Sequence, residues 1–258
     1  MAVMDEFREE REALKNADFK TKFRYFLDYY KWHVIVVVCI IGFVASYIHG
    51  IVTAKDAAIN GYFVNFFTDM DYDNELAVAF AEYADIDTEE YDVLLDTSLQ
   101  INKDAIDEST IAATQKVTVM MAAGEMDFLT CDEATFLTYA TPDSLHDLRD
   151  IYTEEELAKY ADYIYYVDMD VIREKEAIFD SYDSVAMETY QAPEYDHFAP
   201  EEMADPMPIG ICIEESPILK EYFYYYPGSI PLGVLVNSTR VDTTKQFIDF
   251  LFQGLLPE

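Results

Sequence analysis

The chain has few cysteines and histidines, the residues that most often bind zinc or crosslink a small fold. It has three cysteines and four histidines in 258 residues, with no CxxC pair. Cys39 lies inside a long apolar run, so only Cys131 and Cys212 remain, either as one disulfide or as two buried thiols. The sequence therefore predicts no metal site and no disulfide framework.

Catalytic motifs are also missing. The sequence has no GxSxG elbow, no HExxH helix and no phosphate-binding loop. His33 and His49 flank the apolar run, while His146 and His197 stand among acidic residues, as surface histidines do. Carboxylates are so numerous that no particular pair is singled out as an acid–base pair. We therefore expect no enzymatic activity, no catalytic residues and no cofactor.

Basic residues are scarce in the longer, C-terminal part of the chain. From His33 onward there are ten Lys and Arg against 44 Asp and Glu, which gives a net charge of −34. A surface this negative repels nucleic-acid phosphates and anionic lipids, so nucleic acid is excluded as a partner. The charge is typical of a solvated coat that keeps a domain soluble.

One acidic group resembles the start of a calcium-binding loop. Asp69, Asp71 and Asp73 alternate as they do there, but Asn74 replaces the required glycine and Phe80 the bidentate glutamate. Acidic residues are also favourable at a helix N-terminus. The pattern therefore predicts the start of a helix and not a calcium site.

The most distinctive stretch is His33–Val52, which contains no Asp, Glu, Lys or Arg. About 20 apolar residues are the length that a helix needs to cross a bilayer. A cleaved signal peptide is the alternative, since small residues follow at Thr53 and Ala54. The 32 residues before the run and its length favour an uncleaved anchor, and the uniform apolarity argues against a core helix.

Charge around this run predicts its orientation. Four basic residues (Lys20, Lys22, Arg24 and Lys31) precede it closely, whereas only Lys55 follows. The positive-inside rule then gives a cytoplasmic, amphipathic juxtamembrane segment (1–32), a transmembrane helix (33–52) and an extracellular domain (55–258). Aromatic residues before the run form an interfacial belt: Phe23, Tyr25, Phe26, Tyr29, Tyr30 and Trp32. We expect a single-pass protein of the cell membrane.

The extracellular domain alternates apolar strand patterns with helical ones. The expected strands are 57–67, 91–97, 126–131, 163–167, 209–213 and 230–236. The expected helices are 68–84, 104–124, 132–140, 153–160, one beginning at Ser216-Pro217, and 243–252. Their ends are marked by N-caps at Asp104, Asp132 and Ser216, by Gly124 after a C-terminus, and by a capping box of Thr153 and Glu156. Val117–Val119 also suits a strand, and the proline-rich stretch 180–208 is expected to be a surface excursion. The pattern predicts an α/β domain with a mixed, partly parallel sheet and flanking helices.

Several segments, taken in order, resemble one protein family. They are Ala122–Leu129, Phe136, Tyr139-Ala140, Leu145–Leu148, Pro208–Ile211, Pro231–Val234, Asn237-Ser238 and Phe247–Leu251. Together they are similar to extracellular solute-binding proteins of the type 2 periplasmic-binding fold. The resemblance implies a lobe of that fold, reduced in size, with a transmembrane tether in place of the usual lipid-anchored cysteine.

Ligands of open α/β sheets bind beyond the carboxyl ends of parallel strands. Under this fold the ligand-binding residues are Thr97 and Ser98 after one strand and Asp132 and Glu133 after another; helix capping and turn formation are their alternative roles. The aromatic run Tyr222–Tyr226 with Tyr163, Tyr165 and Tyr166 suits sugar stacking or a partner surface, and equally a core.

Two functions follow from these expectations. The first is a membrane-anchored binding module for a small solute such as a sugar or peptide. The alternative is a non-catalytic structural or regulatory interaction domain of a cell-envelope complex, with an envelope protein as partner. A deep polar cleft favours the first, and an exposed aromatic patch without such a cleft favours the second.

Overall fold

A computed structural model describes residues 18–68, 72–102, 107–181, 186 and 189–256. The chain divides into two compact units, Met1–Lys55 and Asp56–Glu258. We call the second unit the sheet domain. The acidic triplet Asp69, Asp71 and Asp73 falls largely outside the described residues, as does Asp104.

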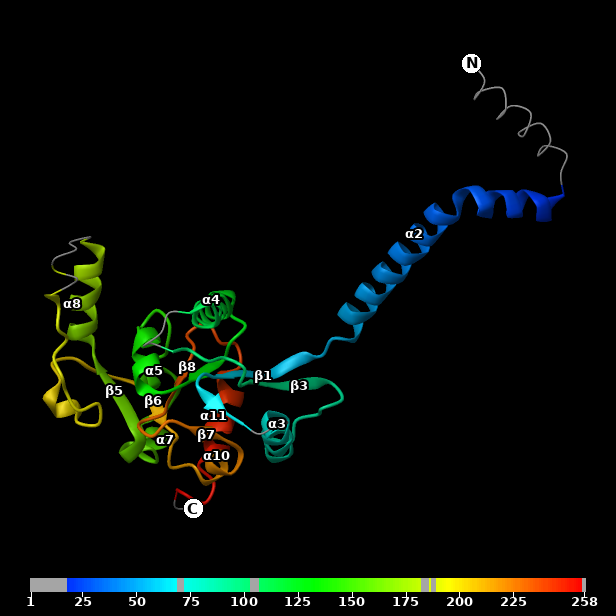
Figure 1. The fold of residues 1–258 in the computed structure, drawn as a ribbon. Helices are drawn as coiled ribbons and strands as arrows, with labels where there is room; N and C mark the ends of the chain where they lie inside the picture. The colour runs from blue at the N-terminus through cyan, green and yellow to red at the C-terminus, as the bar shows by residue number, and fades with distance from the viewer. Residues whose placement is uncertain (1–17, 69–71, 103–106, 182–185, 187–188, 257–258) are drawn as a thin grey trace. The chain divides into compact units, whose positions relative to one another are not determined.

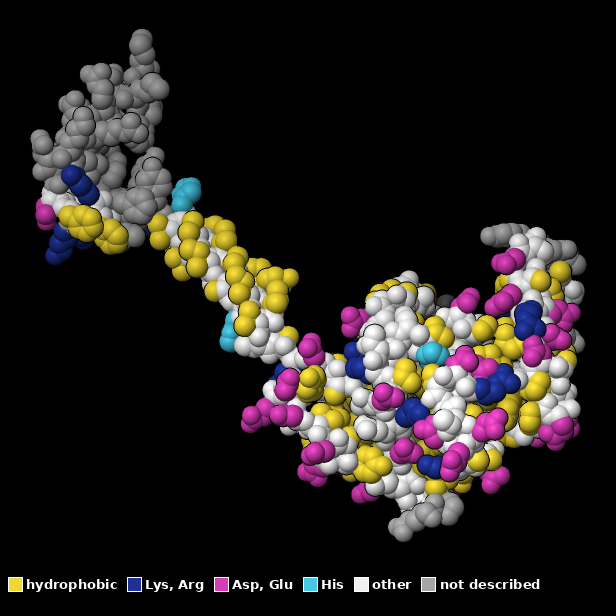
Figure 2. Space-filling model, turned by 180° about the vertical axis from the view of Figure 1, so that it is seen from behind, with side chains coloured by type: hydrophobic (Ala, Val, Ile, Leu, Met, Phe, Trp, Pro, Cys, Tyr) yellow, Lys and Arg dark blue, Asp and Glu magenta, His cyan; other side chains and the backbone are white. Residues whose placement is uncertain are grey.

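The described part of the first unit is mainly one long helix, α2 (Phe19–Thr53). Its part from Lys31 to Thr53 has a mean hydropathy of 2.5 and is long and apolar enough to cross a membrane. The side chains of this part are exposed, so no protein core accounts for their apolar character (Figure 2). Its length and composition fit a membrane span or a signal segment. Of the aromatic belt, Phe23 and Trp32 are exposed, and the side chains at 25–30 are not described.

The sheet domain is built on a six-stranded mixed sheet (Figure 1). The strand order is β3 (Tyr91–Asp96), β1 (Asp56–Phe63), β4 (Phe128–Thr130), β8 (Pro231–Val234), β6 (Pro206–Cys212) and β5 (Ile164–Asp168). β1 is parallel to both β3 and β4, and the remaining three pairings are antiparallel. The mixed, partly parallel α/β fold expected from the sequence is confirmed.

Alternation along the strands divides the core into two apolar layers. Phe63 and Phe128 point to the layer covered by α3 (Tyr72–Tyr83), α10 (Pro217–Tyr222) and α11 (Val241–Leu251). Tyr62 and Leu129 point to the layer covered by α4 (Glu108–Ala123) and α5 (Glu133–Tyr139). Shorter elements complete the domain: α6 (Leu148–Ile151), α7 (Glu154–Ala158), η1 (Ala161–Tyr163) and η2 (Pro200–Glu202).

Helix ends follow the residues expected to cap them. Asp132 and Ser216 accept hydrogen bonds from backbone N–H groups of α5 and α10, and Thr153 forms a capping box with Glu156. Gly124 ends α4 in the left-handed conformation, at φ +70°. Asp107 caps the start of α4, and Val117–Val119 lies within this helix rather than in a strand.

The expected strand 57–67 is wrong in one respect, because it is broken at Asn65. This residue has φ 64°, a left-handed conformation that no strand residue adopts. The chain therefore leaves the sheet after β1 and forms β2 (Phe66–Phe67), which pairs with β7 (Tyr224–Tyr225) in a separate two-stranded ribbon.

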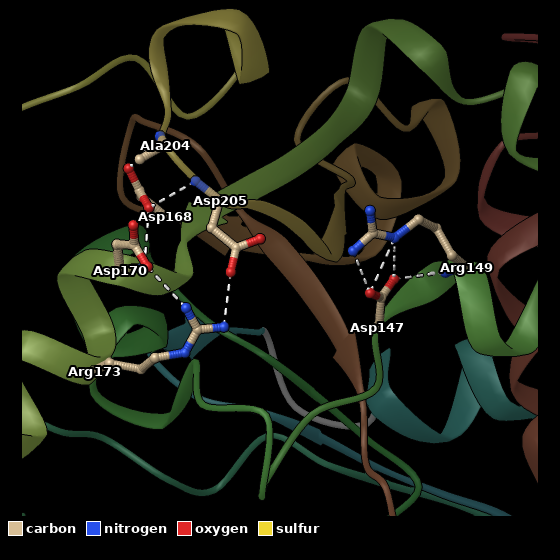
Figure 3. Close-up of polar contacts among 7 residues, drawn as sticks. All are labelled: Asp147, Arg149, Asp168, Asp170, Arg173, Ala204 and Asp205. Atoms are coloured by element: carbon tan, nitrogen blue, oxygen red, sulfur yellow. Dashed lines mark hydrogen bonds and ion pairs between the residues drawn. The ribbon is translucent and has the colours of Figure 1, made fainter.

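Between β5 and the proline-rich stretch lies α8 (Met169–Asp180), a helix that was not predicted from the sequence and that stands away from the sheet in Figure 1. The buried carboxylate of Asp168 holds the two ends of the segment 169–205 together (Figure 3). It accepts hydrogen bonds from the backbone N–H groups of Ala204, Asp205 and Asp170, at 2.8, 3.2 and 3.0 Å. Burial opposes ionisation, but these donors hold the pKa of Asp168 below its usual range.

Candidate functional site

The topological switch point of the sheet lies between β1 and β4. From β1 the chain passes through α3 to β3 on one side, then through α4 to β4 on the other. Because α3, which follows β1, and α5, which follows β4, cover opposite faces, the chain leaves the carboxyl ends of β1 and β4 in opposite directions. Open α/β sheets bind their ligands at this position, so it is the candidate site.

Asn65 occupies the switch point. Its side chain is buried, and its Nδ2 donates to the carbonyl of Ile101 at 3.0 Å and to Oδ2 of Asp132 at 2.6 Å. Its Oδ1 accepts the backbone N–H of Ile101 at 2.7 Å. The left-handed backbone turns this side chain across the end of β4. All of the amide's hydrogen-bonding capacity is therefore directed at the domain's own groups.

Asp132, one of the four predicted ligand residues, lies beside Asn65 but is already engaged. Its Oδ1 accepts the backbone N–H of Thr135 at 3.0 Å, and its Oδ2 accepts the Thr135 hydroxyl at 2.7 Å. Thr135 is 1% exposed. The carboxylate caps α5 and binds Asn65, which is the structural alternative considered for it.

The segment after β3 is hydrogen-bonded to the residues that follow β1. The backbone N–H of Asn65 donates to the carbonyl of Leu99 at 3.0 Å, and the side chain of Gln100 donates to the carbonyl of Phe66 at 2.8 Å. Leu99 is buried in the layer on the α4 side. These contacts hold Leu99 and Gln100 against the turn that follows β1.

Ser98, another predicted ligand residue, hydrogen-bonds to a neighbouring carboxylate. The backbone N–H and the hydroxyl of Ser98 both donate to Oδ1 of Asp96, at 2.9 and 2.6 Å. Asp96 also forms an ion pair with Lys116 at 2.6 Å, and these partners keep its pKa below the usual range although burial opposes this. Thr97 lies in an open hollow along the edge of β3.

Glu133, the fourth predicted ligand residue, accepts a hydrogen bond from a buried tyrosine. Its Oε1 accepts the hydroxyl of Tyr165 at 3.0 Å, and burial and this carboxylate raise the pKa of Tyr165. Burial, followed by Glu214 and Glu133, also raises the pKa of the Cys212 thiol, which makes it a poor nucleophile. Cys131 and Cys212 are both buried and are not bonded to each other.

The described residues of the sheet domain line several open hollows. One of about 350 Å³ lies between α4 and α5, beside Met121, Tyr139 and Asn237. Another of about 570 Å³ lies along β3. Within the described residues no three His, Cys, Asp or Glu side chains gather closely enough to hold a metal ion.

Exposed aromatic side chains gather on the β2–β7 ribbon. Phe67, Tyr224 and Tyr226 are 40%, 67% and 59% exposed, and the rings of Phe67 and Tyr226 meet edge to face with centroids 5.4 Å apart. We call these three residues the aromatic patch. Part of the tyrosine run expected to stack a sugar or to cover a partner is therefore on the surface. The hydroxyl of its neighbour Tyr225, by contrast, donates to the carbonyl of Glu214 at 2.8 Å.

Of the four predicted ligand residues, Asp132 is the one that hydrogen-bonds to Asn65. The sequence did not single out Asn65 as a site residue, because it lies within an apolar run that predicts a continuous strand. The available signal was the residue type, since asparagine is enriched in the left-handed conformation. Comparison of the chain with protein-family models, with curated proteins and with solved structures gave no match.

Proposed function

We propose that the sheet domain is a non-catalytic interaction module of the cell envelope that α2 holds at the membrane. The observation that carries this proposal is the hydrogen bonding of Asn65. Its amide binds Ile101 and Asp132 at the position where a related sheet binds a solute. A ligand at this position has to displace a buried network whose groups are all satisfied.

The surface of the domain supports protein recognition. The aromatic patch presents large rings to solvent, and aromatic residues are enriched in protein interfaces. Figure 2 shows acidic side chains spread over the face that it draws, with few basic ones among them. A partner with basic groups is attracted by such a surface, and the encounter is accelerated electrostatically.

The orientation in the membrane is part of the proposal. The four basic residues before the apolar part of α2 support a cytoplasmic N-terminus, and the sheet domain then lies outside the cell. The relation to solute-binding proteins also stays a proposal. It is supported by the doubly wound half of the sheet, in which β1 lies between its parallel neighbours β3 and β4.

Thermal unfolding of the full chain in nanodiscs tests the proposal. Sugars, amino acids, short peptides and Ca²⁺ are each added in excess, and the melting temperature of the sheet domain is measured. A ligand at about 100 times its Kd stabilises a protein by about 2.7 kcal/mol, an easily seen shift. We expect no shift with any of them.

A matched variant sharpens the result. Asn65→Gly keeps the left-handed backbone and removes the side chain that fills the switch point. A shift in the wild type that Asn65→Gly changes would place a solute at this site and contradict the proposal.

A further inference from the structure

The two edges of the sheet differ in how the described residues cover them. At the β5 edge, the backbone N–H of Tyr166 donates to the carbonyl of His197 at 2.9 Å. The N–H of Asp168 donates to the hydroxyl of Tyr195 at 3.1 Å, and Nδ1 of His197 bonds to the carbonyl of Tyr166 at 2.7 Å. The end of the excursion thus blocks strand addition at this edge.

At the β3 edge, the described residues show no such cover along Val93–Asp96. β3 is the terminal strand of the sheet and pairs only with β1. Along Val93–Asp96, no other backbone among the described residues hydrogen-bonds to its outer side. Tyr91 and Leu94 are 38% and 44% exposed. An edge of this kind presents free N–H and C=O groups, the template onto which extended segments add.

A hollow of about 570 Å³ runs along this strand. It is lined by six consecutive residues, 93–98, and bounded by Ala77 of α3 on one side and Met120 of α4 on the other. Val93 and Leu95 face the α3 layer, whereas Leu94 pairs with Asn60 of β1 and faces the α4 side. An added strand therefore finds apolar contacts on both faces, with alternate side chains directed to each.

Charge at this edge selects the occupant. Asp92 and Asp96 belong to β3, and Asp87 and Glu90 precede it. Glu90, followed by burial and by the charge of Asp56, raises the pKa of Tyr91, the first residue of β3. Among the described basic residues that follow β1, Lys116 contacts this strand through its ion pair with Asp96. A second copy of the chain would bring like charges together, so edge-to-edge pairing of two copies is disfavoured.

We propose that the β3 edge is the docking site for an extended segment of a partner protein, with alternating basic and apolar residues, that adds to the sheet as a seventh strand. This inference rests on the proposed function and names the surface and the partner chemistry for it. Main-chain hydrogen bonds supply affinity, and the acidic, apolar flanks of β3 supply selectivity.

The probe is a labelled peptide of about six residues that alternates lysine and valine, the length of an ordinary strand. Its binding to the full chain in nanodiscs of neutral lipid is measured by fluorescence anisotropy. Two matched peptides accompany it: one with glutamate in place of lysine, and one N-methylated on the backbone along one edge. We expect the lysine peptide to bind, and both matched peptides to bind at least about tenfold more weakly.

Variants locate the binding. Leu94→Lys puts a positive charge at the centre of the edge and is expected to weaken the lysine peptide about tenfold or more. Phe179→Lys makes the same change at an exposed apolar residue of α8, 50% exposed, and is expected to leave binding unchanged. An unchanged melting temperature shows that both variants are folded. If Leu94→Lys lowers the melting temperature, Leu94→Glu, which adds a negative charge at the same place, serves as the second edge variant and is expected to strengthen binding of the lysine peptide.

The results separate the two proposals. Absence of binding, or equal binding of the N-methylated peptide, overturns strand addition at β3. A photo-crosslinker that captures a protein in intact cells from Tyr226 but not from Leu94 also overturns the β3 site, and leaves the interaction module standing. A solute that shifts the melting temperature through Asn65 overturns the interaction module itself.

Discussion

Nε of Arg240 lies 2.7 Å from Oδ2 of Asp127, which joins two residues that are 113 positions apart. Asp127 is fully buried at the start of β4 and also accepts the backbone N–H of Asn60 at 2.7 Å and the hydroxyl of Ser238 at 2.6 Å. The C-terminal part of the chain is thereby fixed to the amino end of the sheet.

Arg240→Ala leaves the buried carboxylate of Asp127 without its cation. We expect the free energy of unfolding to fall by about 3 kcal/mol, because removal of one partner of a buried pair uncovers a charge. Urea unfolding of the full chain, followed by near-ultraviolet circular dichroism, measures the change. Arg173→Ala removes the exposed ion pairs to Asp170 and Asp205 and serves as the control, with an expected loss of at most about 1 kcal/mol. Equal losses would show that burial does not govern the Asp127 pair.

Substitutions at Asn65 separate its backbone role from its side-chain role. Asn65→Gly and Asn65→Ala lose the same hydrogen bonds, but only alanine is strained at φ 64°. We expect Asn65→Ala to be less stable than Asn65→Gly by about 1 kcal/mol in urea unfolding. Similar stability of the two variants would contradict a left-handed conformation at this position.

The ion pair of Glu156 and Lys245 makes the domain sensitive to acid. Nζ of Lys245 lies 2.8 Å from Glu156 Oε1, and this contact with the N–H and hydroxyl of Thr153 lowers the pKa of Glu156 to about 2. Because this pKa is lower in the folded state, the stabilisation is complete above the ordinary value of 4.5 and is lost as pH falls from there towards 2. We expect Glu156→Gln to flatten the dependence of the melting temperature on pH in this window, while Glu154→Gln leaves it unchanged. The same slope in the Glu156→Gln variant would exclude this residue as its source.

Thr130 offers a stabilising substitution. Its hydroxyl is buried at the end of β4 and has no hydrogen-bond partner among the described residues. Thr130→Val replaces this hydroxyl by a methyl group of similar shape, and we expect the free energy of unfolding to rise by about 1 kcal/mol. Thr130→Ser, which keeps the hydroxyl, should give no gain. A loss of stability in Thr130→Val would reveal a polar partner for this hydroxyl.

The fate of α2 distinguishes an anchor from a signal peptide. An epitope at the N-terminus of an uncleaved anchor stays on the same chain as the sheet domain after an alkaline wash of the membranes. We expect both to remain in the membrane fraction, and added protease to digest only the sheet domain of intact cells. Release of the sheet domain without the epitope would identify a cleaved signal segment.

Local signals predicted much of this fold. The caps at Asp132 and Ser216, the glycine end of α4 and the box of Thr153 and Glu156 act over a few residues, so each is legible in the sequence. The contacts of the candidate site could not be predicted in the same way. Asn65 reaches Asp132, 67 positions away, and only the folded sheet brings them together. The four predicted ligand residues were chosen by their place after a strand, which holds equally for residues that cap helices.

The position of β8 governs when the domain can fold. This strand lies between β4 and β6, although 100 residues separate Thr130 from Pro231. At about 5–20 residues per second, synthesis takes about 5–20 s to cover that interval. During that time β4 lacks its partner β8, and the unpaired side of Phe128 and Leu129 can pair with a wrong strand. Completion of the sheet therefore waits for the last tenth or so of the chain, and premature termination before Pro231 leaves two half-sheets with nothing to join them.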